Sequence, residues 1–314
     1  MNIVKPQPVV TTPKVSKMTL GAVIRGKQDM PIRTLLFGTE GIGKSSWAAA
    51  APRPIFIGVE DGTAHLDVER FPAPETWDDV KEAVRVLTQE EHPYKTLVID
   101  TLDWAEPLLW AHLCKRDSQP NIEAYGYGKG YQAALDEWRV FLAQLERARA
   151  RGMHVILLAH AWIKSFKNPA GNDYDRFELK LHPKAGGLLK EWVDSVLFAT
   201  YETFAEQDTK TKRVKGISTG ARIVHTTHSA AWDAKNRHSL PDQLPLDYEA
   251  FAAAMRTQQV ASPEAFVTAI RAKAAPLTED VKKKVEAAIT RAGGNAEKLA
   301  QLNNWMNAQA GGEA

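Results

Sequence analysis

The chain has 314 residues, of which 25% are charged, and its formal net charge is only +2. This length and composition fit a globular protein with a sizeable core, and the near-balanced charge means that any nucleic-acid binding must come from local patches. The single cysteine, Cys114, excludes an internal disulfide and a metal cluster built on cysteines.

The N-terminal stretch, residues 1–17, carries prolines among scattered lysines. It lacks the continuous apolar run of a signal peptide or an anchor, so we expect a flexible N-terminal arm. No later stretch approaches the length of a membrane span. Together with the lone cysteine, which suits a reducing compartment, these features predict a cytoplasmic protein with no membrane partner.

A phosphate-binding motif follows directly on the apolar, strand-like run 32–37. Residues 38–45 read Gly-Thr-Glu-Gly-Ile-Gly-Lys-Ser, which matches G-x-x-x-x-G-K-[ST], and a helix-compatible stretch follows. The glycines let backbone N–H groups turn inward around an anion, and the helix N-terminus adds partial positive charge. We expect Lys44 to reach the β- and γ-phosphates of ATP and Ser45 to hold Mg²⁺. The predicted nucleotide-binding residues are Gly38, Thr39, Glu40, Gly41, Ile42, Gly43, Lys44, Ser45 and Ser46.

Short apolar runs alternate with helical patterns as far as residue 200, which predicts an α/β fold with a mostly parallel central sheet flanked by helices. We expect an antiparallel extension at one edge over 195–227, with a hairpin tip at 208–212. The predicted domains are an arm (1–17), a core (18–245) and a C-terminal helical region (246–314). The predicted strands are 32–37, 54–59, 95–100, 153–159 and 193–201, and the predicted helices are 45–51, 76–89, 102–115, 131–151, 247–259, 262–274, 278–292 and 295–309.

Ionisable side chains stand at the carboxyl ends of three predicted strands. Asp100 ends an apolar strand in the manner of a Walker B aspartate, which steadies Mg²⁺ beside Ser45. Glu60 and Asp61 follow the second strand, where a general base would orient the attacking water; the sequence favours Glu60 and leaves Asp61 open. His160 stands at the end of the fourth strand, where it would sense the γ-phosphate.

This order of motifs resembles the RecA/RadA/DnaB group of P-loop ATPases. The segment 234–241, Ala-Lys-Asn-Arg-His-Ser-Leu-Pro, is similar to the Lys-Asn-Arg motif of RadA-type proteins. The core most resembles phage-encoded RecA-like ATPases of the single-strand annealing or UvsX-like recombination group, without the zinc module and Lon-like domain of RadA. The resemblance implies that Glu60 activates water, that Asp100 is the Walker B acid, and that Lys235 and Arg237 reach the γ-phosphate of a neighbouring subunit.

In RecA-like proteins, two loops at the carboxyl edge of the sheet bind single-stranded DNA. The corresponding segments here, 121–131 and 161–187, are long and contain glycine, aromatic and basic residues. Aromatic rings that stack on bases, beside lysines that track phosphates, suit binding of single strands without sequence preference. The predicted nucleic-acid contacts are Tyr125, Tyr127, Lys129, Trp162, Lys164, Phe166, Lys167 and Arg176.

The leading hypothesis is therefore a DNA-dependent ATPase of phage recombination, which uses ATP and Mg²⁺, assembles with itself in a ring or filament on single-stranded DNA, and promotes annealing or strand pairing. A single-strand-binding protein is a further expected partner. One alternative is an assembly protein gated by nucleotide binding, with the helical tail recruiting a partner. A helicase-like translocase and a small-molecule P-loop kinase also stay open, although the Lys-Asn-Arg segment disfavours the kinase.

Overall fold

The computed structural model describes residues 18–24, 28, 30–60, 62–169, 171–207, 214–260, 263–275, 279–295, 298, 299 and 302. The chain divides into two compact units, residues 1–30 and 31–314. The predicted arm 1–17 and hairpin tip 208–212 lie outside the described residues. No helix in the described part of the chain is long and apolar enough to cross a membrane.

In the first unit, the described residues form one short 3₁₀ helix, η1 (Leu20–Ala22). Apolar side chains around this turn are exposed, among them Met18, Leu20 and Ile24. This unit therefore presents an apolar surface of its own.

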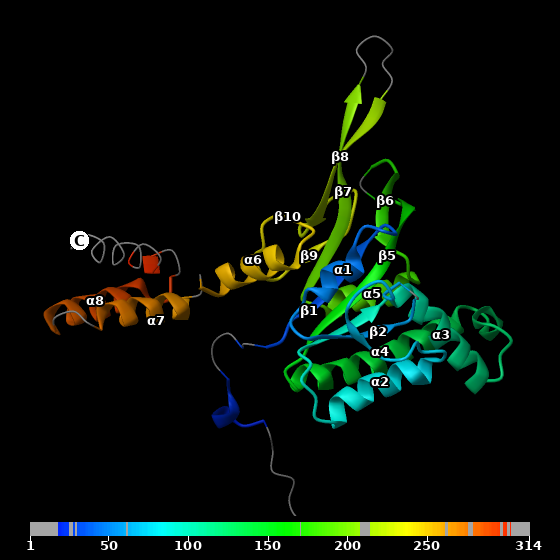
Figure 1. Ribbon diagram of the computed structural model, residues 1–314, viewed down its shortest axis with the longest axis horizontal. Coiled ribbons are helices and arrows are strands. Elements are labelled where there is room, and N and C mark those ends of the chain that lie inside the picture. Colours follow the sequence, from blue (N-terminus) through cyan, green and yellow to red (C-terminus); the bar gives the residue numbers. More distant parts are fainter. Residues whose placement is uncertain are drawn as a thin grey trace, which may run out of the picture. The chain divides into compact units, whose positions relative to one another are not determined.

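The second unit is built on a sheet in the order β10-β8-β7-β1-β5-β4-β2-β3, with β6 paired to β5 and β9 to β7 (Figure 1). The central strands run parallel, and β6, β8, β9 and β10 are antiparallel additions, so the predicted fold class is confirmed. The strands are β1 (Arg33–Gly38), β2 (Pro54–Gly58), β3 (Glu69–Arg70), β4 (Thr96–Asp100), β5 (His154–Phe166), β6 (Tyr174–Leu179), β7 (Ser195–Gln207), β8 (Val214–His225), β9 (Lys235–Asn236) and β10 (Gln243–Pro245).

The sheet is covered on both faces. Alternate residues of a strand point to opposite faces, so Leu35 and Phe37 of β1 join the core cluster of α2–α5, whereas Leu36 joins that of α1 and α6. Burial on both sides explains why the central strands read as continuous apolar runs. The helices are α1 (Lys44–Ala49), α2 (Trp77–Gln89), α3 (Leu102–Arg116), η2 (Ile122–Tyr125), α4 (Lys129–Ala150), α5 (Pro183–Trp192) and α6 (Tyr248–Val260).

The segment 161–187 differs from the expected long loop. β5 continues past the sheet to Phe166, turns, and pairs with β6 as an antiparallel hairpin, after which α5 begins at Pro183. The predicted DNA-binding segment is thus mostly regular structure.

The C-terminal helices do not all belong to one separate unit. In α6, Tyr248 and Phe251 pack edge-on against Trp47 of α1, at centroid distances of 5.0 and 5.3 Å. Helix α6, which follows the predicted boundary at residue 245, thus completes one face of the core, and the domain boundaries stay a prediction. Helices α7 (Pro263–Ala274) and α8 (Glu279–Ala292) share their own apolar cluster, which includes Ile270, Val285 and Leu299. Of the last predicted helix, 295–309, the structure describes only part.

Candidate nucleotide-binding site

The phosphate loop connects the carboxyl end of β1 to the first turn of α1. Gly41 and Gly43 have φ angles of +71° and +108°. Residues other than glycine rarely adopt these backbone angles, so the two glycines permit the tight turn of the loop. Gly43 is the N-cap of α1, and Lys44 and Ser45 lie in its first turn. The loop thus places a helix N-terminus where an anion would bind.

Lys44 is buried inside the loop. Its side chain reaches back to donate hydrogen bonds to the carbonyls of Thr39, at 3.0 Å, and Gly38, at 3.3 Å. Burial lowers the pKa of Lys44, although the surrounding carboxylates, with Asp100 first, oppose this shift. A cation buried among polar groups in this way is poised to bind phosphate oxygens.

Ser45 and Asp100 bring two hard oxygen ligands together. The Ser45 hydroxyl donates a 2.6 Å hydrogen bond to Asp100 Oδ2 at the end of β4. Asp100 is only 3% exposed, and burial raises its pKa. A hydroxyl beside a carboxylate at the phosphate loop is the donor set that suits Mg²⁺ carried by a nucleotide. These residues therefore fit the predicted metal.

Glu60 faces the same site from the end of β2. Its backbone N–H donates to the Asp100 carbonyl at 3.2 Å, which ties the two strand ends together. Its carboxylate accepts a hydrogen bond from Thr101 Oγ1 at 3.4 Å and lies 3.8 Å from His160 Nε2. With 31% of its side chain exposed, Glu60 can meet a water molecule. Asp61, the other candidate base, lies outside the described residues.

His160 is held by an aspartate that the sequence analysis missed. Asp103 accepts hydrogen bonds from the backbone N–H and Nδ1 of His160, both at 2.9 Å. Burial alone would raise the pKa of Asp103, but these hydrogen bonds bring it below the ordinary value. A carboxylate at Nδ1 assigns the proton to that nitrogen and leaves Nε2 facing Glu60. The available signal was an aspartate in the first turn of the helix after the Walker B strand, which usually means only a helix start.

A protein-family model described as an AAA domain matches residues 30–238. The chain belongs to this family of P-loop NTPases. A search among curated proteins finds no match. The matched region runs from just before β1 to His238 and contains every residue of the site described above.

Two predicted residues of the AAA domain lie away from its phosphate loop. Lys235 donates three hydrogen bonds to carbonyls at the end of α5, at 2.6 to 2.9 Å, and Arg237 lies 3.5 Å from Asp194. Both flank the start of β7, because Lys235 pairs with Val196. Their predicted role in a neighbouring subunit stays a prediction.

The predicted nucleic-acid residues divide into exposed and packed groups. Arg176 is 6% exposed and ion-paired with Asp233, so it does not face solvent as expected. Phe166 packs against Tyr174 and the Arg176 guanidinium, and the Tyr125 hydroxyl bonds the Leu113 carbonyl. The exposed group comprises Tyr127, Lys129, Trp162, Lys164 and Lys167.

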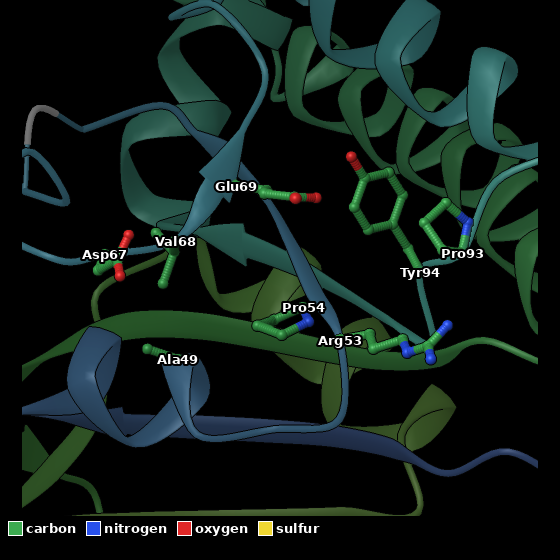
Figure 2. A pocket seen from close by; sticks show the side chains of 8 residues that line it. All are labelled: Ala49, Arg53, Pro54, Asp67, Val68, Glu69, Pro93 and Tyr94. Atoms are coloured by element: carbon green, nitrogen blue, oxygen red, sulfur yellow. The ribbon is translucent and has the colours of Figure 1, made fainter.

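A pocket of about 390 Å³ lies elsewhere on the AAA domain (Figure 2). Arg53 and Pro54, which line it, stand at the amino end of β2, whereas Glu60 follows the carboxyl end. Figure 2 shows Tyr94 and Glu69 facing one another across it, and their hydrogen bond raises the pKa of Tyr94. The pocket is thus separate from the nucleotide site.

Proposed function

We propose that this AAA domain hydrolyses ATP and that single-stranded DNA stimulates the reaction. The observation that carries the first part is the convergence of Lys44 from α1, Glu60 from the end of β2 and His160 from β5 on the Ser45–Asp100 pair. Phosphoryl transfer needs cations at the developing charge and an oriented nucleophile, and these residues supply both.

The chain's own residues account for each step. Glu60 orients a water molecule and takes its proton as the water oxygen attacks the γ-phosphorus. The bond from that phosphorus to the β–γ bridging oxygen breaks, so ADP and phosphate leave. Lys44 and the loop N–H groups stabilise the charge on the phosphate oxygens. Mg²⁺, held by Ser45 and Asp100, would further neutralise the β- and γ-phosphates.

The proposed DNA surface is the hairpin β5–β6, with Tyr127 and Lys129 at the start of α4. Trp162 is 42% exposed, and Lys164 Nζ lies 5.6 Å from the centre of its ring. An exposed aromatic face beside cations supports stacking on bases together with phosphate binding. His160 lies on the same strand, β5, directly before the residues that pair with β6. The strand therefore connects a DNA contact on the hairpin to the ATP site.

We further propose that copies of the chain assemble on DNA as a ring or filament and promote annealing or strand pairing in phage recombination, with a single-strand-binding protein as a further partner. Lys235 and Arg237 would complete the ATP site of a neighbouring copy, because an arginine delivered in trans stabilises the charge on the γ-phosphate. This proposal is supported by the contacts of the two residues, which are with Val193 and Asp194 and not with the phosphate loop of their own chain.

The test is ATP turnover with and without single-stranded DNA at low salt, for the wild type and for Lys44→Ala, Glu60→Gln and Arg139→Ala, a control on the exposed face of α4. We expect DNA to raise turnover in the wild type and control, and the first two variants to be inactive. Turnover that ignores DNA, with no DNA complex at low salt, contradicts the proposal. If Glu60→Gln still anneals DNA at the wild-type rate, nucleotide binding alone sets function, as in the assembly-protein alternative.

A further inference from the structure

An arginine from the antiparallel edge of the sheet lies against the phosphate loop. Arg222 of β8 donates a hydrogen bond from Nη1 to the Ile42 carbonyl at 3.3 Å, although 180 positions separate the two residues. A methyl group added to Gly43 would lie 2.7 Å from Arg222 Nη1 and 3.7 Å from Leu246 Cδ2. A guanidinium and an apolar side chain thus cover one side of the loop.

A backbone hydrogen bond fixes Leu246 beside Arg222. The Leu246 N–H donates to the Arg222 carbonyl at 2.9 Å, directly after the pairing of β10 with β8. Arg222 is exposed, and within the described residues its side chain has one recorded hydrogen bond, to Ile42. The single bond to Ile42 uses one of the five N–H donors of the guanidinium. Most of its binding capacity therefore remains available beside the loop.

The sheet order fixes which end of a nucleotide would meet this side of the loop. Glu60, Asp100 and His160 stand on β2, β4 and β5, or directly after them, and all three strands lie on one side of β1 (Figure 1). They define the γ-phosphate end of the site. β7 and β8 lie on the other side of β1, so Arg222 stands on the side of the loop away from this γ-phosphate end, where the nucleoside end of a nucleotide would lie.

We propose that Arg222 stacks its guanidinium on the base of the bound nucleotide and that Leu246 adds apolar contact beside it. This inference rests on the proposed nucleotide binding at the phosphate loop and adds the residue that holds the base. Guanidinium groups are planar and weakly hydrated, so they stack well on aromatic faces. Stacking contacts the face of a base and leaves its edges unread, so adenine and guanine nucleotides gain equally from Arg222.

The experiment measures calorimetric affinities of the full chain for ADP, GDP and inorganic tripolyphosphate, each with Mg²⁺. The variants are Arg222→Ala, Arg222→Lys and the control Arg139→Ala. We expect Arg222→Ala to weaken ADP and GDP about tenfold, in the range of a cation–π contact, and to leave tripolyphosphate unchanged, because that ligand has no base. Arg222→Lys, which keeps the charge and loses the planar group, should recover only part of the loss.

Equal weakening of tripolyphosphate and ADP overturns the inference, because Arg222 would then act on the phosphates or on the loop through Ile42. Unchanged ADP affinity in Arg222→Ala overturns it as well. The proposed function has a different failing outcome. If the wild-type chain binds ADP with the expected dependence on Arg222 but does not hydrolyse ATP, the base contact is supported and the proposed activity is contradicted.

Discussion

At the scale of single residues, the candidate site depends on residues that orient its functional side chains through hydrogen bonds. Asp103 fixes the ring of His160, and the Asp100 carbonyl fixes the backbone of Glu60. The sequence predicted Lys44, Ser45 and Asp100 from motif spacing, and the structure brings them together. It did not predict Asp103, because its partner lies 57 positions away and the pairing arises only when α3 packs beside β5.

Replacing Asp103 with Asn should lower ATP turnover by about 10- to 100-fold, as for other residues that orient a functional histidine. The amide keeps the shape but no longer holds the His160 proton on Nδ1. Steady-state kinetics should show the loss in kcat with KM little changed. Asp136→Asn, on the exposed face of α4, is the matched control. A loss confined to KM would argue against this role.

Glu106 lies one turn after Asp103 in α3 and is also buried, but it does not contact His160. It is 5% exposed, and one of its oxygens accepts a 2.9 Å hydrogen bond from the His182 N–H. Burial raises its pKa from 4.5 to about 7. The folded state thus binds the proton more tightly than the unfolded state does.

The stability that Glu106 contributes should therefore be fully present below pH 4.5 and decline as the pH rises through about 7. The shift corresponds to roughly 3 kcal/mol at about 1.4 kcal/mol per pH unit. Glu106→Gln, which mimics the protonated acid, should match the wild type at pH 5 and exceed it at pH 8 in urea denaturation. An unaltered pH dependence in the variant would refute the assignment.

At the scale of elements, the hairpin β5–β6 links the proposed DNA surface to the ATP site. The Lys180 N–H, just after β6, donates to the His160 carbonyl at 2.9 Å, so the Ala161–Leu179 end of the hairpin lies beside the histidine. Central strands were predictable because burial on both faces makes them continuously apolar. β3 and β6 were not, because β3 has only two residues and β6 lacks a regular alternation of polar and apolar residues, with Asp175 and Arg176 in succession.

The double variant Lys164→Ala/Lys167→Ala should weaken single-stranded DNA binding and reduce the salt dependence of log K by about 0.7 per lysine removed. Trp162→Ala should cost about 1–3 kcal/mol of binding through lost stacking, with an unchanged salt slope. Fluorescence anisotropy at several salt concentrations measures both. Lys115→Ala, on α3, is the control; a slope that changes as much in this control would remove the hairpin from the DNA surface.

At the scale of the whole molecule, α6 packs into the apolar cluster of α1 and the central sheet, whereas α7 and α8 pack around an apolar cluster of their own. The sequence predicted the helices α6, α7 and α8 but could not show where the first of them packs, because amphipathic helices look alike whatever they cover. The contact of Phe251 with Trp47 shows that α6 packs against α1.

Phe251→Ala should therefore destabilise the core by about 3–5 kcal/mol, since it leaves a cavity against α1. Phe266→Ala, in the cluster of α7 and α8, is the matched variant and should leave core unfolding unchanged. Urea unfolding followed by loss of nucleotide binding reports on the core alone. Equal effects of the two substitutions would mean that both clusters unfold as one unit.

The position of Lys235 and Arg237 has a geometric consequence for any assembly that uses them. They flank the amino end of β7, whereas the phosphate loop leaves the carboxyl end of the parallel strand β1. In the proposed ring or filament, each copy would give its basic pair to one neighbour and receive a pair from another, so the contacts would be head-to-tail and the assembly would have a direction. An open filament of this kind would carry one incomplete site at one end, whereas a closed ring would complete every site.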